Sequence, residues 1–255
     1  MDTADQIAVV TGGGSGLGEA TARRLAARGA RVAILDFDAT RGNAVAESIG
    51  GLAVETDVSD EASVEAAFAT VLDAMGAAPR IVVNCAGIGT AARIVGREGK
   101  LSTGLFERTV RVNLFGTYNV MSHGARAMQG LPPANDDGER GVIINTASVA
   151  FEDGQLGQSA YAASKGAVAS MCLPAAREFA KTGIRVMTIA PGLFQTPMMD
   201  GLPPEVSAQI TANIPFPPRL GRAEEFAYLA EDIVRNPFLN GTTIRLDGAV
   251  RLPPR

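Results

Sequence analysis

The chain has 255 residues, of which 46% are apolar and 20% charged, which suits a globular protein built as one large α/β domain over residues 1–255. A formal charge of −4 without a basic cluster gives no electrostatic footprint for nucleic acid, and no run of about 18 apolar residues predicts a membrane span. The single histidine, His123, excludes a multi-histidine metal site; we expect it on the polar side of a helix and expect no bound metal.

The first residues and the cysteines indicate a reduced compartment. The opening MDTADQ is acidic and lacks the basic start of a signal peptide. Cys85 and Cys172 lie in apolar segments without the spacing of a disulfide framework or a metal site. We therefore expect a cytoplasmic protein with free thiols.

Seven short apolar runs predict strands, which follow one another at 7–11, 31–35, 52–56, 80–84, 141–145, 184–189 and 242–246. Their hydrophobicity is continuous rather than alternating, which is typical of strands covered on both faces in a parallel sheet. Amphipathic segments separate the runs and predict helices. This alternation predicts a doubly wound, seven-stranded parallel sheet with right-handed crossovers and helices on both faces.

Three irregular segments interrupt the alternation. Residues 89–104 form a polar, glycine-rich insertion, and residues 130–141 are predicted to form an exposed turn. Residues 192–221 mix six prolines with apolar side chains. Long loops in compact domains are usually functional, so we expect this last segment to bind an apolar substrate.

The segment after the first predicted strand has the pattern of a dinucleotide-binding turn. Gly12, Gly16 and Gly18 separate that strand from a helix, whose first amide groups can bind a pyrophosphate. Asp36 ends the second strand, 18 residues after Gly18, where an acid bonds the adenosine ribose. Because this carboxylate would repel a 2′-phosphate, we expect NAD rather than NADP, although Arg41 is close enough in sequence to leave NADP open.

A tyrosine and a lysine share one face of a later predicted helix. Tyr161 and Lys165 are four residues apart, so their side chains can meet, and the lysine charge would favour the phenolate. Chance also produces such pairs on surface helices. Ser148 taken alone fits a cap at a strand end, but it stands at the carboxyl edge of the sheet, where open α/β sheets bind ligands.

Together these motifs make the chain similar to the short-chain dehydrogenase/reductase family. The TGGGSGLG turn, NCAG at 84–87, Ser148, YAASK at 161–165 and PG at 191–192 stand in the family's order. The resemblance implies a single-domain Rossmann fold, NAD as cofactor and a homotetramer. It assigns Tyr161 as general acid/base, Ser148 as donor to the substrate oxygen, Lys165 as the group that lowers the tyrosine pKa, and Asn113 as holder of a relay water.

The resemblance also implies which residues contact the cofactor. They are Gly12, Ser15, Gly16, Leu17 and Gly18 in the first turn, Asp36, Asp57 and Val58 after the next strands, Asn84, Cys85, Ala86 and Gly87 on the ribose side, Tyr161 and Lys165, and Pro191, Gly192, Phe194 and Thr196 over the nicotinamide.

Longer segments, among them 141–168 and 183–199, resemble one subgroup of the family, the type II 3-hydroxyacyl-CoA dehydrogenases. This resemblance implies oxidation of an (S)-3-hydroxyacyl-CoA, with Gln155, Ser148, Tyr161 and the 192–221 loop contacting the substrate. The acids of AFEDGQ, at 150–155, stand differently from those of the subgroup. Three alternatives stay open: a hydroxysteroid or other secondary-alcohol dehydrogenase, a 3-oxoacyl-carrier-protein reductase, against which Asp36 argues, and a non-catalytic NAD-binding scaffold.

Overall fold

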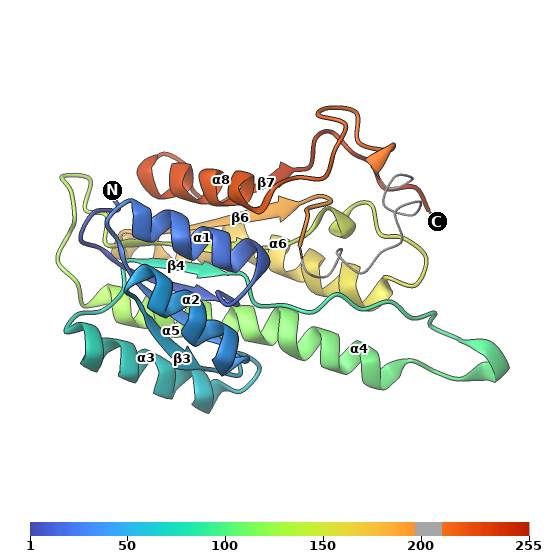
Figure 1. Ribbon diagram of the computed structural model, residues 1–255, viewed down its shortest axis with the longest axis horizontal. Coiled ribbons are helices and arrows are strands. Elements are labelled where there is room, and N and C mark those ends of the chain that lie inside the picture. Colours follow the sequence, from blue (N-terminus) through green and yellow to red (C-terminus); the bar gives the residue numbers. More distant parts are fainter. Residues whose placement is uncertain (197–210, 255) are drawn as a thin grey trace.

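The computed structural model describes residues 1–196 and 211–254, and in this part of the chain seven parallel strands form one sheet (Figure 1). The strand order is β3-β2-β1-β4-β5-β6-β7, so the chain reverses its direction of travel across the sheet between β3 and β4. The strands are β1 (Ile7–Thr11), β2 (Arg31–Asp36), β3 (Leu52–Glu55), β4 (Ile81–Asn84), β5 (Gly141–Thr146), β6 (Ile184–Pro191) and β7 (Thr243–Leu246). Each coincides with a predicted run, so the predicted fold is confirmed.

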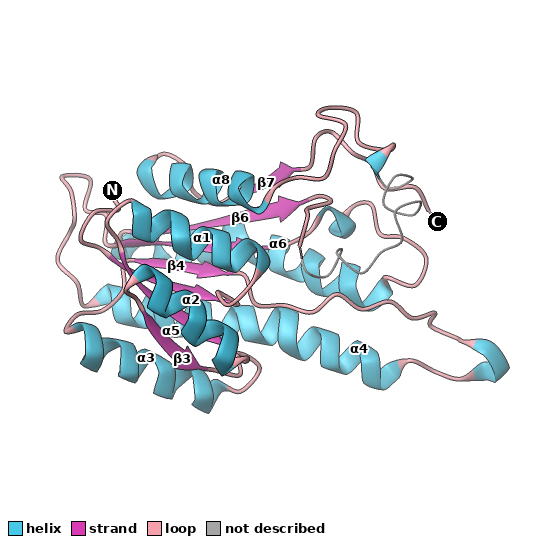
Figure 2. Ribbon diagram, in the orientation of Figure 1, coloured by secondary structure: helices cyan, strands magenta, loops and turns pink. Residues whose placement is uncertain are grey.

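Helices cover both faces of the sheet, which explains the continuous hydrophobicity of the strands (Figure 2). One face packs against α1 (Gly16–Ala27), α2 (Ala39–Ile49) and α8 (Ala223–Arg235), and the other against α3 (Glu61–Met75), α5 (Gly116–Gln129) and α6 (Ser159–Phe179). Neighbouring residues of β1 show the alternation: Val9 packs on the α3 side and Val10 on the α1 side, and both are fully buried.

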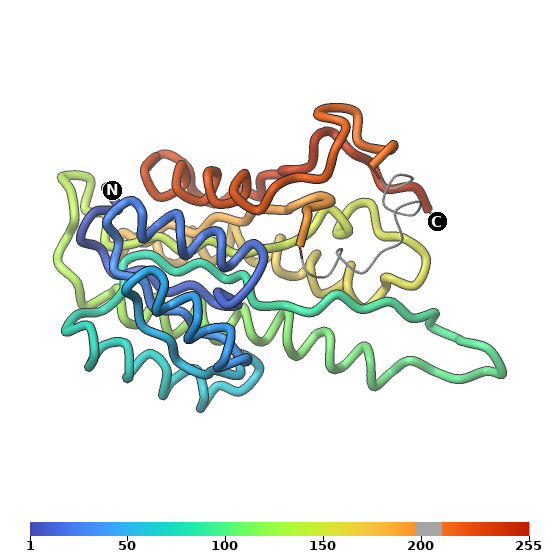
Figure 3. Tube along the Cα trace, in the orientation of Figure 1, coloured from blue at the N-terminus to red at the C-terminus, as the bar shows by residue number. Residues whose placement is uncertain are grey.

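The insertion at 89–104 leads into a long helical segment and projects away from the sheet (Figure 3). An isolated antiparallel bridge joins Val95 to Leu101 at its tip, around the short helix η1 (Arg97–Gly99). The helix α4 (Thr103–Val110) then continues through a π-helical turn, η2 (Arg111–Phe115), into α5. The π turn holds Asn113, one of the predicted site residues.

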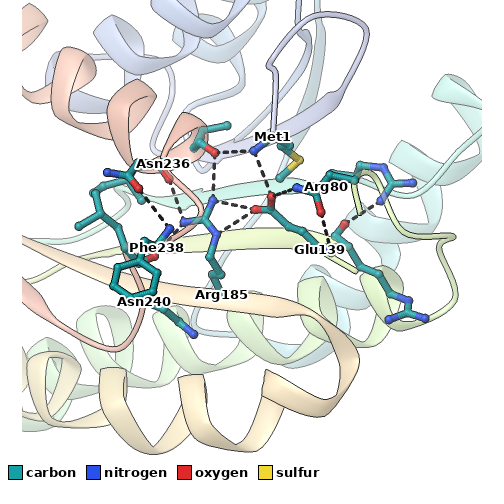
Figure 4. A network of polar contacts seen from close by, with 12 residues as sticks. Met1, Arg80, Glu139, Arg185, Asn236, Phe238 and Asn240 are labelled. Atoms are coloured by element: carbon teal, nitrogen blue, oxygen red, sulfur yellow. Dashed lines mark hydrogen bonds and ion pairs between the residues drawn. The ribbon is translucent and has the colours of Figure 1, made fainter. Parts of the chain in front are cut away.

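A buried ion-pair network closes the amino edge of the sheet (Figure 4). The Arg185 guanidinium contacts Glu139 at 2.7 Å and donates to the carbonyl oxygens of Ile233, Val234 and Leu239. Burial alone would raise the pKa of Glu139, but Arg185 and the Met1 amino group hold that pKa below its ordinary value. The prediction of an exposed turn at 130–141 is therefore wrong at its end, because Glu139 is drawn inside by Arg185.

Candidate active site

The carboxyl ends of six strands, β1 to β6, open into one cavity of about 880 Å³. Most of the predicted site residues line it: Gly12, Ser15, Gly16, Leu17, Gly18, Asp36, Asp57, Val58, Cys85, Ala86, Gly87, Ser148, Tyr161, Lys165, Pro191, Gly192, Phe194 and Thr196. The structure therefore brings together, on one edge of the sheet, motifs that lie up to 184 positions apart in the chain. Of the predicted substrate loop, residues 192–196 and 211–221 are described, and 197–210 lie outside the described residues.

The first turn is packed so tightly that glycine is required at two positions. Gly12 has a φ of 62°, and a side chain there would lie 2.9 Å from the backbone of Ala86. A side chain on Gly18 would meet the Gly12 carbonyl oxygen at 2.1 Å. The absence of side chains at Gly12 and Gly18 lets the start of α1 lie close against the sheet. Ser15 makes no side-chain cap, so the first amide groups of α1 remain available to an anion in the cavity.

Asp36 stands beside this turn with its carboxylate fixed by the backbone. One oxygen accepts from the amide of Gly14 at 2.8 Å, and the other accepts from the amide of Asp38 at 2.9 Å. Each oxygen keeps a lone pair that can accept a ribose hydroxyl. Arg41 also lines the cavity, and its guanidinium lies 3.3 Å from the carboxylate of Asp38.

Tyr161 and Lys165 lie on the first turns of α6, at the opposite end of the cavity from Asp36. Lys165 is buried, and its Nζ donates to the Thr146 carbonyl at 2.8 Å rather than to the tyrosine. The distance from Nζ to the centre of the Tyr161 ring is 5.9 Å. Burial lowers the pKa of Lys165 to about 8.

The expected lowering of the tyrosine pKa is not seen in the protein alone. Burial raises the pKa of Tyr161, and the neighbouring Ser148 hydroxyl only partly opposes that rise. The sequence pattern suggested a direct Tyr161–Lys165 contact because it gives the shared helix face. It could not show that a strand-end carbonyl takes the ammonium group.

Asn113 does not line the cavity but hydrogen-bonds to segments that do. Its side chain accepts from the amide of Ile88 at 2.8 Å and donates to the carbonyl of Ile88 and to the Ser164 hydroxyl. Ser164 in turn donates to the Tyr161 carbonyl at 2.8 Å. Asn113 thus ties the strand-end segment to the helix that carries the tyrosine. Its side-chain amide is already committed and its main-chain carbonyl accepts from the Thr117 hydroxyl at 2.8 Å, and its role as holder of a relay water stays a prediction.

Two other predicted contacts also lie outside the cavity lining. Asn84 is buried in the sheet, where its amide donates to Asn145 at 2.9 Å. Gln155 donates from its amide to the Pro253 carbonyl at 3.0 Å. The direction of each side chain depends on a partner that is distant in sequence, and their contacts with cofactor and substrate stay predictions.

Several residues that line or shape the cavity were not predicted. Thr11 accepts the amide groups of Cys85 and Ala86 at 3.1 and 3.0 Å and so fixes the second turn. Arg108 and Arg111 line the cavity from α4 and η2. The sequence could have indicated Thr11, because it directly precedes the glycine turn. It could also have indicated the two arginines, because residues three apart share one face of a helix.

The cavity also contains a thiol, Cys85, but burial raises its pKa to about 11 and keeps it neutral.

His123 is buried rather than on a polar face, with its Nδ1 2.9 Å from Arg126 and its ring 6.1 Å from that of Phe68. Within the described ranges, no group of three or more acidic, histidine or cysteine side chains could hold a metal ion. Among the described helices, none is both long and apolar enough to cross a bilayer.

Comparison with known proteins agrees with this geometry. The family model described as short chain dehydrogenase matches residues 6–206. Proteins named 3-hydroxyacyl-CoA dehydrogenase type-2 from Drosophila melanogaster and Homo sapiens are each 48% identical to the chain over 252 residues, which cover 97% of this chain and 98% and 96% of theirs. The crystal structure of 3-hydroxyacyl-CoA dehydrogenase type-2 from Mycobacterium avium is similar with a TM-score of 0.92 and 42% identity, covering 100% of this chain and 98% of that one. The chain therefore belongs to the short-chain dehydrogenase family.

Proposed function

We propose that the protein is an NAD-dependent dehydrogenase that interconverts an (S)-3-hydroxyacyl-CoA and the 3-oxoacyl-CoA. Family membership makes it an oxidoreductase that uses a nicotinamide nucleotide. The observation that carries the proposal is one cavity lined by the start of α1 and Asp36 on the side of β2 and by Ser148, Tyr161 and Lys165 on the side of β5. The choice of substrate is supported by the names of the relatives that share nearly the whole chain.

The cavity lining offers groups of the kinds that a dinucleotide needs. The first amide groups of α1 would hold the pyrophosphate, and Asp36 would accept the adenosine ribose hydroxyls. Lys165 would contact the nicotinamide ribose, and residues 191–196 would cover the nicotinamide. When bound, NAD supplies the acceptor for the substrate hydride. NAD is preferred to NADP because the Asp36 carboxylate would lie against a 2′-phosphate, while Arg41 is already paired with Asp38.

The protein residues would manage the substrate proton. Ser148 would donate a hydrogen bond to the substrate oxygen, and Tyr161 would remove the hydroxyl proton during oxidation. An ordinary tyrosine has a pKa of about 10, so this step requires stabilisation of the phenolate. The Lys165 ammonium, 5.9 Å from the ring centre, favours the phenolate through its charge.

The direct test is turnover. Purified protein with NAD and (S)-3-hydroxybutyryl-CoA should form NADH, measured by its absorbance, and the (R) isomer should react much more slowly. A faster reaction with NADPH and a carrier-protein substrate would favour the reductase alternative, and turnover of steroids alone would favour the hydroxysteroid alternative. NAD binding without turnover of any secondary alcohol would indicate a scaffold. The expected homotetramer and cytoplasmic location remain part of the proposal, the former checked by light scattering.

A further inference from the structure

One arginine joins three carboxylates close to the catalytic end of the cavity. Arg245, in β7, donates to Glu152 at 2.5 Å, to Asp153 at 2.6 Å and to Asp247 at 2.9 Å. Its side chain is 17% exposed, and those of Asp153 and Asp247 are 13% and 9% exposed, so solvent screens these two contacts only partly, whereas Glu152 is 51% exposed and its contact is screened more. Hydrogen bonds between ionised groups at these distances are among the stronger ones in proteins.

Two of these acids, Glu152 and Asp153, belong to the segment after Ser148. Ser148 accepts the amide of Ala150 at 3.2 Å and thereby caps the short helix η3 (Val149–Phe151). Glu152 and Asp153 come directly after η3. A shift of these acids therefore moves the helix to which the Ser148 hydroxyl is bonded.

Residues 250–254 hold the same segment from its other end. The Arg245 guanidinium also donates to the carbonyl of Val250, which is fully buried, at 3.1 Å. The Gln155 side chain donates to the Pro253 carbonyl, and the Leu156 amide donates to the Pro254 carbonyl, both at 3.0 Å. The segment from Ser148 to Leu156 is thus clamped between β7 and this terminal stretch.

The Arg245 charge offsets the repulsion among three carboxylates that lie close together. Glu152, Asp153 and Asp247 converge on one guanidinium, and only Asp247 has a second cation among the described residues, Arg251 at 3.2 Å. Without Arg245 the carboxylates would repel one another in a partly buried place. The repulsion would displace the loop that carries Glu152 and Asp153, because Asp247 lies against the backbone of Gly192.

We propose that Arg245 is a positioning residue for the reaction: it holds the segment 149–156 so that the Ser148 hydroxyl stays aligned with Tyr161. The inference rests on the proposed function, because it assigns Ser148 to the substrate oxygen. Displacements of about 1 Å in such a group can cost up to about 100-fold in rate. The groups expected to hold the adenosine and pyrophosphate belong to β1, α1 and β2, and within the described residues no hydrogen bond or ion pair joins them to the cluster.

The test compares two conservative substitutions, Arg245→Lys and Arg185→Lys. Both keep the positive charge and lose the planar fork that binds several acceptors at once. Arg185 is the matched control because it is also enclosed but lies at the amino edge of the sheet. R245K should lower kcat/KM for the acyl substrate by about tenfold or more and change the KM for NAD by a clearly smaller factor, because Asp247 adjoins the expected cofactor contacts only at Gly192. R185K should lower the Tm and leave both kinetic constants nearly unchanged. Equal kinetic profiles, or a loss confined to NAD, would overturn the proposal.

A second comparison tests the role of charge. The variant Arg245→Met should be slower than R245K, and the combined change Arg245→Met with Glu152→Gln and Asp153→Asn should regain part of the loss, because it removes the repulsion. Failure to regain any activity contradicts the electrostatic explanation.

Hydrogen exchange separates this proposal from the proposed function, since it needs no substrate. Peptides covering 148–158 should exchange faster in R245K than in the wild type, while those of 7–27 should not change. If the wild type oxidises no hydroxyacyl-CoA, the proposed function fails. If exchange at 148–158 is unchanged, the positioning role of Arg245 fails.

Discussion

Burial of Lys165 has a consequence for stability that can be measured apart from catalysis. The pKa of its ammonium falls from an ordinary 10.5 to about 8 because of burial, so the folded protein releases this proton more easily than the unfolded chain. Between pH 8 and 10.5 the unfolded chain binds more protons at this group, so the contribution of Lys165 to stability rises with pH in this window. The full effect is roughly 3 kcal/mol, of which about 2 kcal/mol should develop between pH 7 and 9.5.

The assay is chemical unfolding of two proteins, one with Lys165 and one with Lys165→Met, both carrying Cys85→Ala. The cysteine is removed because its pKa, raised to about 11 by burial, also depends on the charge of Lys165, so its titration would not cancel between the two proteins. The difference in free energy of unfolding should move by about 2 kcal/mol in favour of the lysine protein from pH 7 to 9.5. Lys181→Met, which removes an exposed lysine, should show no such change. A difference that stays flat for Lys165→Met would refute the reasoning.

Three further predictions concern the cofactor, the proton and the buried network. Tyr161→Phe should abolish turnover and leave NAD binding nearly intact by calorimetry; retained turnover would remove the tyrosine from the mechanism. Asp36→Ala should weaken NAD and relax the preference against NADP, and an unchanged ratio of the two kcat/KM values would mean that another group contacts the ribose. Arg185→Met leaves the Glu139 carboxylate short of a partner and should cost about 3 kcal/mol or more in urea unfolding, whereas Arg41→Met, which breaks an exposed ion pair with Asp38, should cost less than about 1 kcal/mol.

The fold could be predicted because its signals are local. A buried parallel strand must be apolar on both faces, so runs such as 184–189 identify the strands without knowledge of their neighbours. The glycine turn is partly local, since a side chain on Gly18 would meet the Gly12 carbonyl oxygen, whereas the crowding at Gly12 comes from Ala86 in a distant segment.

The parts that could not be predicted depend on pairs that only the fold brings together. Arg245 meets Glu152 from 93 positions away, and Arg185 meets Glu139 from 46 positions away. Helical spacing places Tyr161 and Lys165 on one face, but it does not show that Thr146 takes the ammonium group. The family motifs therefore identified the right segments, and the direction of Asn113, Asn84 and Gln155 came from contacts with no periodic signal.

The π turn at Arg111–Phe115 makes the long helical segment sensitive to its length. Compared with an ordinary turn, a π turn accommodates one extra residue, which rotates α4 by about 100° about the helix axis relative to α5. Upstream, Thr109 meets Thr90 through their hydroxyls at 2.8 Å, while downstream Val120 and Met128 face the core. Removal of a single residue here would restore a regular α-helix. Either Thr109 would then turn away from Thr90, or Val120 and Met128 would turn away from the core. We therefore expect a one-residue deletion between 111 and 115 to be more damaging than any single substitution at an exposed position of the same turn.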